Sequence, residues 1–345
     1  MSGSMIVAGG APLVKQRMTG VRRLLRADPQ LRSYHTKRGY ESDLRRFLAW
    51  RNGDDRATKL QVEAYASYLL EQGNSPASVN RSLAAIRWLA RKMADLAFED
   101  ESMDPKEREH WVIHGERIAG KVKDVTYKRT LRGREISGAE VRALLEACVI
   151  DHSPAGIRDA AMIAVAWQVG PRRSEIGWAA AKRTKHGKRH ARGLRLQDYS
   201  PGDDGGGELA IRAAKGDKDR LIPIHNGATA YLDDWLAIRG EDPGPMFYAI
   251  RKDGALLLGQ GLTGQALAYI LEKRARQAAI KPLTWHDFRR TFATEELRNG
   301  TPITVVARGL GHEQITTTAG YDRSGDEEVR QLVKNRVIPY IRRAA

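Results

Sequence analysis

The sequence predicts a mainly α-helical protein with two domains, an all-helical bundle followed by an α+β domain that contains a small β-hairpin. Three observations predict this fold class. The chain of 345 residues is longer than one typical domain. Apolar residues recur at helical spacing through most of its length. Two short strand-like runs in the second half, Glu208–Ala213 and Arg220–Ile224, are separated by a polar Lys-Gly-Asp-Lys turn.

We expect four segments along the chain. Residues 1–28 lack a clear periodicity and form an N-terminal extension that we expect to be partly disordered. Residues 29–118 carry the helical pattern of the first domain. Residues 119–134 are basic, lack an apolar period and are predicted to form a linker. Residues 135–345 form the second domain, which ends in a C-terminal helix.

Capping signals define the helices of the first domain. Thr58 and Gln61 form a capping box, in which each side chain reaches the backbone of the other residue. Ser75 followed by Pro76 is an N-cap with proline at the first helical position. Another helix, before Thr58, is indicated by apolar residues at helical spacing, namely Tyr40, Leu44, Phe47 and Leu48.

The second domain opens with another capping box, formed by Ser137 and Glu140. Residues 157–169 are largely apolar and predict a buried helix. A C-terminal helix over residues 326–341 carries an apolar stripe, which could pack within the chain or dock on a neighbouring copy. Further helices are predicted around residues 227–239, 263–279, 284–298 and 302–309.

The charge distribution indicates a nucleic-acid partner. The formal net charge is +16 and the pI is near 10.0. Three segments, Lys15–Arg46, Ala119–Arg134 and Lys182–Arg195, carry net charges of +7, +5 and +7, and the rest of the chain sums to −3. Concentrated basic segments on a near-neutral globule suit binding to a phosphate backbone.

Composition excludes several other classes. A single cysteine, Cys148, rules out a disulfide framework and fits a reducing compartment. No apolar run is long enough to cross a membrane, and the first ten residues lack the features of a signal peptide, so we expect a cytoplasmic protein. His110 and His114 have a spacing compatible with zinc, but no cysteine or acidic pattern accompanies them, so no metal site is predicted.

Four motifs in the second half carry residues suited to phosphoryl chemistry. Arginine forks bind phosphate oxygens, and a tyrosine becomes nucleophilic when a base and cations lie nearby. No acidic cluster indicates a magnesium site, so these cations would be side chains. The motifs are Gly170-Pro-Arg-Arg-Ser-Glu175, Lys215-Gly-Asp-Lys-Asp-Arg220, His286-Asp-Phe-Arg289, and Leu310-Gly-His312 with Tyr321 nine residues after the histidine.

Together, in this order and at these separations, the motifs resemble the tyrosine recombinase (phage integrase) family. The resemblance covers roughly residues 30–340, and the layout is closest to the simple Cre-like site-specific recombinases. Each motif alone is weak, whereas all four in sequence are specific. The resemblance implies a helical core DNA-binding domain before an α+β catalytic domain of the tyrosine recombinase type.

The resemblance also implies a role for each matching residue. Tyr321 would attack the scissile phosphate and form a 3′-phosphotyrosine link. Arg172 and Arg289 would hold the non-bridging oxygens, His312 would donate a hydrogen bond to the same phosphate, and Lys215 would protonate the departing 5′-hydroxyl.

Two further roles and two ambiguities accompany this set. His286 would act as a base or phosphate ligand, and Glu175 would orient the arginine side. Lys218 competes with Lys215 for the acid role, and Arg172 is chosen over its neighbour Arg173 by spacing alone. Because the covalent link stores the phosphodiester energy, no metal and no cofactor is implied.

The sequence therefore predicts a site-specific DNA recombinase. It would act as a homotetramer on two double-stranded DNA sites with inverted repeats, assembled through the C-terminal helix and located in the cytoplasm at the nucleoid. Alternatives are a type IB topoisomerase-like nicking-closing enzyme and a non-catalytic DNA-binding protein with the same fold. The candidate DNA-binding residues are Arg81, Arg87, Arg91, Lys121, Lys123, Lys128, Arg129, Lys185, Lys188 and Arg189.

Overall fold

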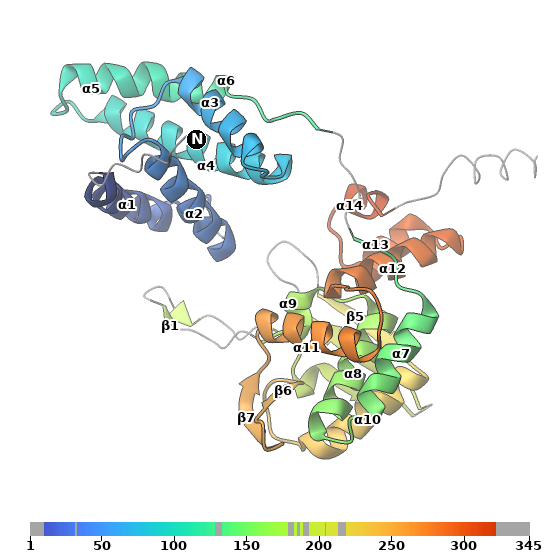
Figure 1. The fold of residues 1–345 in the computed structure, drawn as a ribbon. Helices are drawn as coiled ribbons and strands as arrows, with labels where there is room; N and C mark the ends of the chain where they lie inside the picture. Colours follow the sequence, from blue (N-terminus) through green and yellow to red (C-terminus); the bar gives the residue numbers. More distant parts are fainter. Residues whose placement is uncertain are drawn as a thin grey trace, which may run out of the picture. The chain divides into compact units, whose positions relative to one another are not determined.

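The chain forms two compact units, Met1–Arg129 and Thr130–Ala345. Each unit is described by itself (Figure 1). The point of division lies inside the segment 119–134 that was expected to be a linker. The structure, a computed structural model, describes residues 10–31, 33–127, 133–178, 183–184, 187–188, 193–203, 205–212 and 219–321.

In the described part of the first unit every regular element is a helix, as predicted. The capping box of Thr58 and Gln61 and the N-cap at Ser75 both form at the predicted helix starts. The elements are α1 (Gly10–Ala27), α2 (Tyr34–Trp50), α3 (Lys59–Glu71), α4 (Pro76–Glu99), α5 (Pro105–His110), the π-helical turn η1 (Trp111–Gly115) and α6 (Glu116–Lys121).

The predicted N-terminal extension needs a correction, because residues 10–27 form the helix α1. Met18, Val21 and Leu25 of α1 are buried in the core of the first unit. These three apolar residues lie on one helical face but are separated by basic residues. The stripe is therefore short, and α1 is stabilised by the tertiary contact with α2 rather than by a long periodic pattern.

The start of the expected linker also differs from the prediction. Residues 119–121 belong to α6, and Val122 is buried in the core of the first unit. Asn80 of α4 exchanges hydrogen bonds with the backbone of Val125, at 3.0 and 2.7 Å. The Asn80 side chain therefore holds the segment 122–125 against α4 through hydrogen bonds to its backbone. A pattern of apolar residues in the sequence does not reveal such bonds.

The second unit places most of its helices where the sequence predicts them. The two shortest, α9 and α14, were not predicted because four or five residues contain no measurable period. The elements are α7 (Gly138–Val149), α8 (Pro154–Val169), α9 (Arg173–Ile176), the 3₁₀ turn η2 (Leu196–Asp198), α10 (Gly227–Arg239), α11 (Gly264–Gln277), α12 (Trp285–Arg298), α13 (Ile303–Leu310) and α14 (Ile315–Ala319).

Small antiparallel sheets complete the α+β unit. The predicted hairpin is confirmed: β4 (Gly207–Ile211) pairs with β5 (Arg220–Ile224). β3 (Tyr199–Pro201) adds to the outer side of β4, which gives the order β3-β4-β5. β3 was not predicted, and neither were β6 (Tyr248–Ile250), its partner β7 (Leu256–Gly261), and the two-residue pair β1 (Arg183–Thr184) and β2 (Gly187–Lys188).

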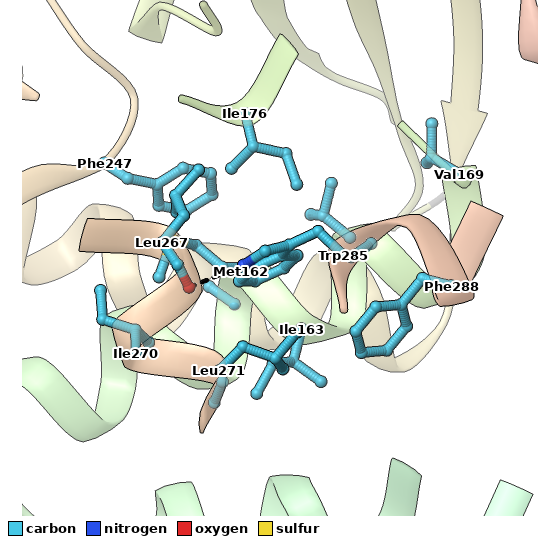
Figure 2. Close-up of a cluster of buried hydrophobic side chains, with 14 of the residues drawn as sticks. Met162, Ile163, Val169, Ile176, Phe247, Leu267, Ile270, Leu271, Trp285 and Phe288 are labelled. Carbon is cyan, nitrogen blue, oxygen red and sulfur yellow. Dashed lines mark hydrogen bonds between the residues drawn. The ribbon is translucent and has the colours of Figure 1, made fainter. Parts of the chain in front are cut away.

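The core of the second unit supports the helix that carries two of the motif residues. Figure 2 shows Trp285 and Phe288 of α12 packed among apolar side chains from α8, α9 and α11. The indole Nε1 of Trp285 donates a 2.7 Å hydrogen bond to the backbone oxygen of Leu267. These buried contacts fix the rotation of α12 about its axis, and so fix the direction of its opposite face.

Among the described residues, no helix has the length and apolar character that crossing a bilayer would require.

Candidate active site

The first site motif begins where α8 ends. Gly170 has φ of +57° and ψ of 41°, a left-handed conformation that glycine adopts without strain. A Cβ atom at this position would lie 3.2 Å from both Leu310 and Phe292. α12 and α13 therefore pack tightly on this turn, which leads directly into Arg172 at the N-cap of α9.

Glu175 joins two arginines at the centre of the site. Its Oε2 accepts hydrogen bonds from the backbone N–H of Arg172 at 2.7 Å and from Nη2 of Arg220 at 2.8 Å. Its Oε1 accepts from Nη1 of Arg172 at 3.0 Å and from Nη1 of Arg220 at 3.2 Å. Burial alone raises the pKa of Glu175, but the hydrogen bonds and charge of Arg220 outweigh it and hold the pKa below its usual value.

The geometry also separates Arg172 from its neighbour. Nη2 of Arg172 lies 3.4 Å from the backbone oxygen of Gly311, close to the third and fourth motifs. Arg173 extends instead toward α11, where its Nε would lie 3.4 Å from a Cβ atom at Gly264. The choice of Arg172 by spacing therefore agrees with the arrangement of the two side chains.

α12 supplies the second arginine of the site. Arg289 is 1% exposed, and its guanidinium donates to the backbone oxygens of Gly170 at 3.0 Å and Leu310 at 2.6 Å. Burial, and then the charge of Arg172, lowers the pKa of Arg289 to about 10. The group remains a cation at neutral pH, held between the ends of α8 and α13.

Tyr321 lies between the two motif histidines. Its hydroxyl is 3.2 Å from Nε2 of His286. Its ring is stacked on that of His312, with centroids 5.8 Å apart and planes 9° apart. On the other side of His312, Nδ1 is 2.8 Å from the hydroxyl of Thr318. The backbone oxygen of Tyr321 accepts a 3.2 Å hydrogen bond from Thr294, which ties the end of the described chain to α12.

Both histidines are neutral at physiological pH. Burial, followed by the charges of Arg290 and Arg289, lowers the pKa of His286. Burial, again helped by Arg289, lowers the pKa of His312 to about 4. A neutral imidazole can accept a proton through one ring nitrogen and donate a hydrogen bond through the other.

The described part of the site holds more positive than negative charge. Arg172, Arg220 and Arg289 contribute three guanidinium groups, and Glu175 contributes the carboxylate that faces them. Burying an uncompensated cation is costly unless an anion binds beside it. A phosphodiester, which presents two charged oxygens to arginine forks, is the ligand that this arrangement suits.

The lysines of the second motif cannot be placed. Lys215 and Lys218 fall within residues 213–218, which lie outside the described residues. Arg220, which ends the same motif, begins β5 and reaches Glu175. The hairpin that carries the candidate acid is therefore attached to the site at its described end.

Two of the candidate DNA-binding arginines are engaged within the first unit. Nε and Nη2 of Arg81 bind the carboxylate of Asp43, at 2.8 and 3.1 Å. Arg87 donates to the backbone oxygen of Val122 at 2.9 Å and to Asp124 at 2.7 Å. Their guanidinium groups already stabilise the packing of α4.

The other candidate DNA-binding residues fall into three cases. Arg91, Lys121 and Lys123 are exposed. Lys188 belongs to β2, but its side chain is not described. Lys128, Arg129, Lys185 and Arg189, like the predicted helix 326–341, lie outside the described residues.

The described residues contain no group of three or more side chains that could hold a metal ion. The rings of His110 and His114, which were noted for their spacing, are 4.7 Å apart at the π-helical turn η1. Two imidazoles provide fewer ligands than a structural zinc site uses.

Comparison with known proteins agrees with the geometry. Residues 134–328 match the model of the phage integrase family, and residues 28–93 match the model of its N-terminal SAM-like domain. The chain belongs to the phage integrase family. The members to which it is similar are tyrosine recombinases, so the protein is a DNA strand-transferring enzyme of this type.

Two related recombinases support this assignment, and they differ in sequence identity and in the share of the chain that they cover. Tyrosine recombinase XerD of Ralstonia nicotianae (strain ATCC BAA-1114 / GMI1000) is 34% identical over 203 residues, which cover 58% of this chain and only 58% of that relative. XerD of Listeria innocua serovar 6a is 26% identical over 302 residues, which cover 84% of this chain and 88% of the relative.

Two solved recombinases share the fold at low sequence identity. XerH bound to its difH substrate in a pre-cleavage complex has a TM-score of 0.57 at 17% identity, with 96% of this chain and 91% of XerH covered. A lambda integrase dimer bound to a COC′ core site has a TM-score of 0.57 at 15% identity, with 89% and 96% covered.

Sequence reasoning missed three residues that build the site. Arg220 ends the second motif and has no role among the sequence predictions, although a charged residue at the start of a buried strand is a usable signal. Asp287, between the two α12 motif residues, accepts four hydrogen bonds that are described below. Thr318 contacts His312 from α14, and no sequence pattern indicated this contact.

Proposed function

We propose that this recombinase cleaves and rejoins duplex DNA at specific sites through a 3′-phosphotyrosine formed on Tyr321. The observation that carries the proposal is the 3.2 Å contact between the Tyr321 hydroxyl and Nε2 of His286, beside buried guanidinium groups. A phenol has a pKa near 10 and needs a neutral base and nearby positive charge to become nucleophilic. Both are present at this position.

In the cleavage step, the Tyr321 oxygen attacks the scissile phosphorus and its proton passes to Nε2 of His286. The bond between phosphorus and the 5′-oxygen breaks. That oxygen takes a proton from Lys215, with Lys218 as the alternative donor, and leaves as a 5′-hydroxyl. Rejoining is the reverse reaction with the 5′-hydroxyl of another strand. The number of phosphodiester bonds is conserved, so the reaction requires no energy source.

The phosphate would be held by the cations around the nucleophile. Arg172 and Arg289 approach from α9 and α12, and each can pair with a non-bridging oxygen. His312 would donate from Nε2, because an Nδ1 that accepts from Thr318 leaves the proton on Nε2. Charge stabilisation of this kind supplies most of the rate enhancement in phosphoryl transfer.

The assembly on DNA remains a proposal as well. Structures of XerH and of the Tn1549 integrase contain DNA, which supports double-stranded DNA as the partner of this chain. We propose two protomers on each inverted-repeat site and a tetramer across two sites, with helix 326–341 as the connecting element, acting in the cytoplasm at the nucleoid.

The test uses a duplex that wild-type protein selects from a random library, prepared with a nick that releases the 5′-hydroxyl after cleavage. We expect wild type to form a covalent protein–DNA adduct that resists SDS, and Tyr321→Phe to form none, because only the phenol oxygen can attack. Tyr321→Phe should still bind the duplex, which controls for folding.

The outcomes separate the alternatives. Absence of an adduct with wild type on its selected duplex would favour the non-catalytic DNA-binding protein. An adduct without strand exchange between two sites, together with relaxation of supercoiled DNA, would favour the nicking-closing enzyme.

A further inference from the structure

Arg220 has a guanidinium group that is buried between the carboxylate of Glu175 and the turn at Gly311, which precedes His312. Its side chain is 6% exposed, and both of its Nη atoms bind Glu175. Each Glu175 oxygen is shared with Arg172, since one also binds the Arg172 backbone N–H and the other its guanidinium. Arg172 and Arg220 thus compete for one carboxylate.

Arg220 also contacts the turn that leads into His312. Gly311 ends α13 with φ of +67°, and a Cβ atom there would lie 2.6 Å from Nη1 of Arg220. The backbone oxygen of Gly311 faces Nη2 of Arg172 at 3.4 Å. The planar guanidinium of Arg220 therefore supports Glu175 and the Gly311 turn at the same time.

This sharing affects the charge that remains available to a phosphate. A carboxylate with a single arginine partner tends to form a bidentate pair that uses the whole fork. Because Arg220 binds both oxygens of Glu175, the carboxylate binds the guanidinium of Arg172 through Nη1 rather than through a bidentate pair. The contact of Arg220 with Gly311 also holds the backbone oxygen of Gly311, just before His312, at 3.4 Å from Nη2 of Arg172.

We propose that Arg220 is a positioning residue for strand cleavage, which acts through Glu175 and Gly311 to hold Arg172 and His312 toward one phosphate. This inference rests on the proposed function, because it assigns Arg220 a part in that reaction. It also distinguishes Arg220 from a buried arginine that only stabilises the fold.

Arg274 of α11 provides the matched control. It is fully buried and binds Asp159 through Nε at 2.9 Å and Nη2 at 2.8 Å. Nη2 also lies 2.8 Å from Asp151. Asp159 and Asp151 lie outside the four motifs, so Arg274→Lys breaks a comparable buried pair elsewhere in the same unit.

The experiment measures single-turnover adduct formation on the nicked, selected duplex, together with DNA affinity and melting temperature. We expect Arg220→Lys to slow adduct formation by about 100-fold, because a misplacement of about 1 Å at the reacting centre has that effect. Affinity should stay within about 2-fold, because most binding energy comes from the phosphate backbone. Arg274→Lys should lower the melting temperature but leave the rate within about 2-fold.

A pH profile adds a measurement that a fold-stabilising role would not change. Arg220 lowers the pKa of Glu175, so Arg220→Met should raise it and add a loss of cleavage from Glu175 protonation to the acid limb that His286 sets in wild type. Arg220→Lys keeps the buried charge and provides the rate comparison even where Arg220→Met does not fold.

Wild-type rates and pH profiles in folded Arg220 variants would overturn the inference, as would rate losses that match those of Arg274→Lys at equal stability. Failure of the proposed function has a different result, in which wild type itself forms no Tyr321-dependent adduct.

Discussion

Arg289 shows how burial changes the chemistry of one side chain. Within the described residues its guanidinium donates to two backbone carbonyls, those of Gly170 and Leu310. Carbonyl oxygens carry only partial charge, so the cation keeps its capacity to bind an anion. Burial, and then the charge of Arg172, lowers its pKa to about 10, which reflects first the cost of burying a cation and second the cost of placing it beside another. A bound phosphate would relieve that cost.

The lowered pKa of a second residue, His286, predicts how the cleavage rate depends on pH. A base must be unprotonated, so cleavage should be lost only as pH falls through the pKa of His286, which lies below its usual value of 6.5. Because this pKa lies below 6.5, we expect the rate of adduct formation to be level above about pH 7.5, one unit beyond that limit. His286→Gln should slow cleavage by about 10²- to 10⁴-fold, the usual worth of general base catalysis.

This is checked by measuring single-turnover rates from pH 5 to 8 for wild type and His286→Gln. A wild-type acid limb centred above pH 6.5, or one that persists unchanged in His286→Gln, would contradict the assignment of His286 as the base.

At the scale of elements, α12 is held by the segment that enters the second unit. The carboxylate of Asp287 accepts hydrogen bonds from the backbone N–H and hydroxyl of Thr284, from the backbone N–H of Arg134 and from Nη1 of Arg290. The backbone N–H of Ile136 donates to Thr291 at 2.9 Å. The entering segment therefore runs along α12, the helix that positions His286 and Arg289.

We expect Asp287→Ala to destabilise the protein by about 2–3 kcal/mol, because it removes a helix cap and leaves the buried Arg290 without its carboxylate. Glu135→Gln is the control in the same segment. Its ion pair with Arg298, 2.6 Å long, is partly exposed, and such pairs contribute about 0–1 kcal/mol. Urea unfolding measures both changes, and equal effects would show that Asp287 is not a special anchor of α12.

At the scale of the whole molecule, we propose that the +16 charge serves two separate purposes. A few buried cations gather at one candidate phosphate site in the second unit. Exposed cations such as Arg91, Lys121 and Lys123 in the first unit are available for the DNA backbone. Exposed cations would bind through counterion release, which depends on salt, whereas the buried cations would act on one phosphate at short range.

This separation predicts different effects of substitution. Lys121→Gln combined with Lys123→Gln should weaken DNA binding and reduce the slope of log affinity against log salt by about 2, or about 1 for each lost contact. Arg172→Ala should leave the slope within about 1 of wild type and stop adduct formation. Fluorescence anisotropy from 50 to 300 mM salt checks the slopes. An unchanged slope in the double lysine variant would show that Lys121 and Lys123 do not contact the DNA backbone.

The sequence by itself determined the class of fold and predicted the residues of the candidate site. Helix starts were predictable at Ser75 and Ser137 because capping is a local interaction between neighbouring residues. Arg172, His286, Arg289, His312 and Tyr321 were identified because their order and spacing form a specific set, and the structure brings the described members together.

Only the tertiary structure decided what depends on contacts between distant segments. α1 is helical because Met18 and its neighbours are buried against α2. Arg220 and Glu175 are 45 residues apart, and Arg134 and Asp287 are 153 residues apart. Local propensity contains no information about such pairs, because their energy comes from burying charge and backbone donors where the fold brings them together.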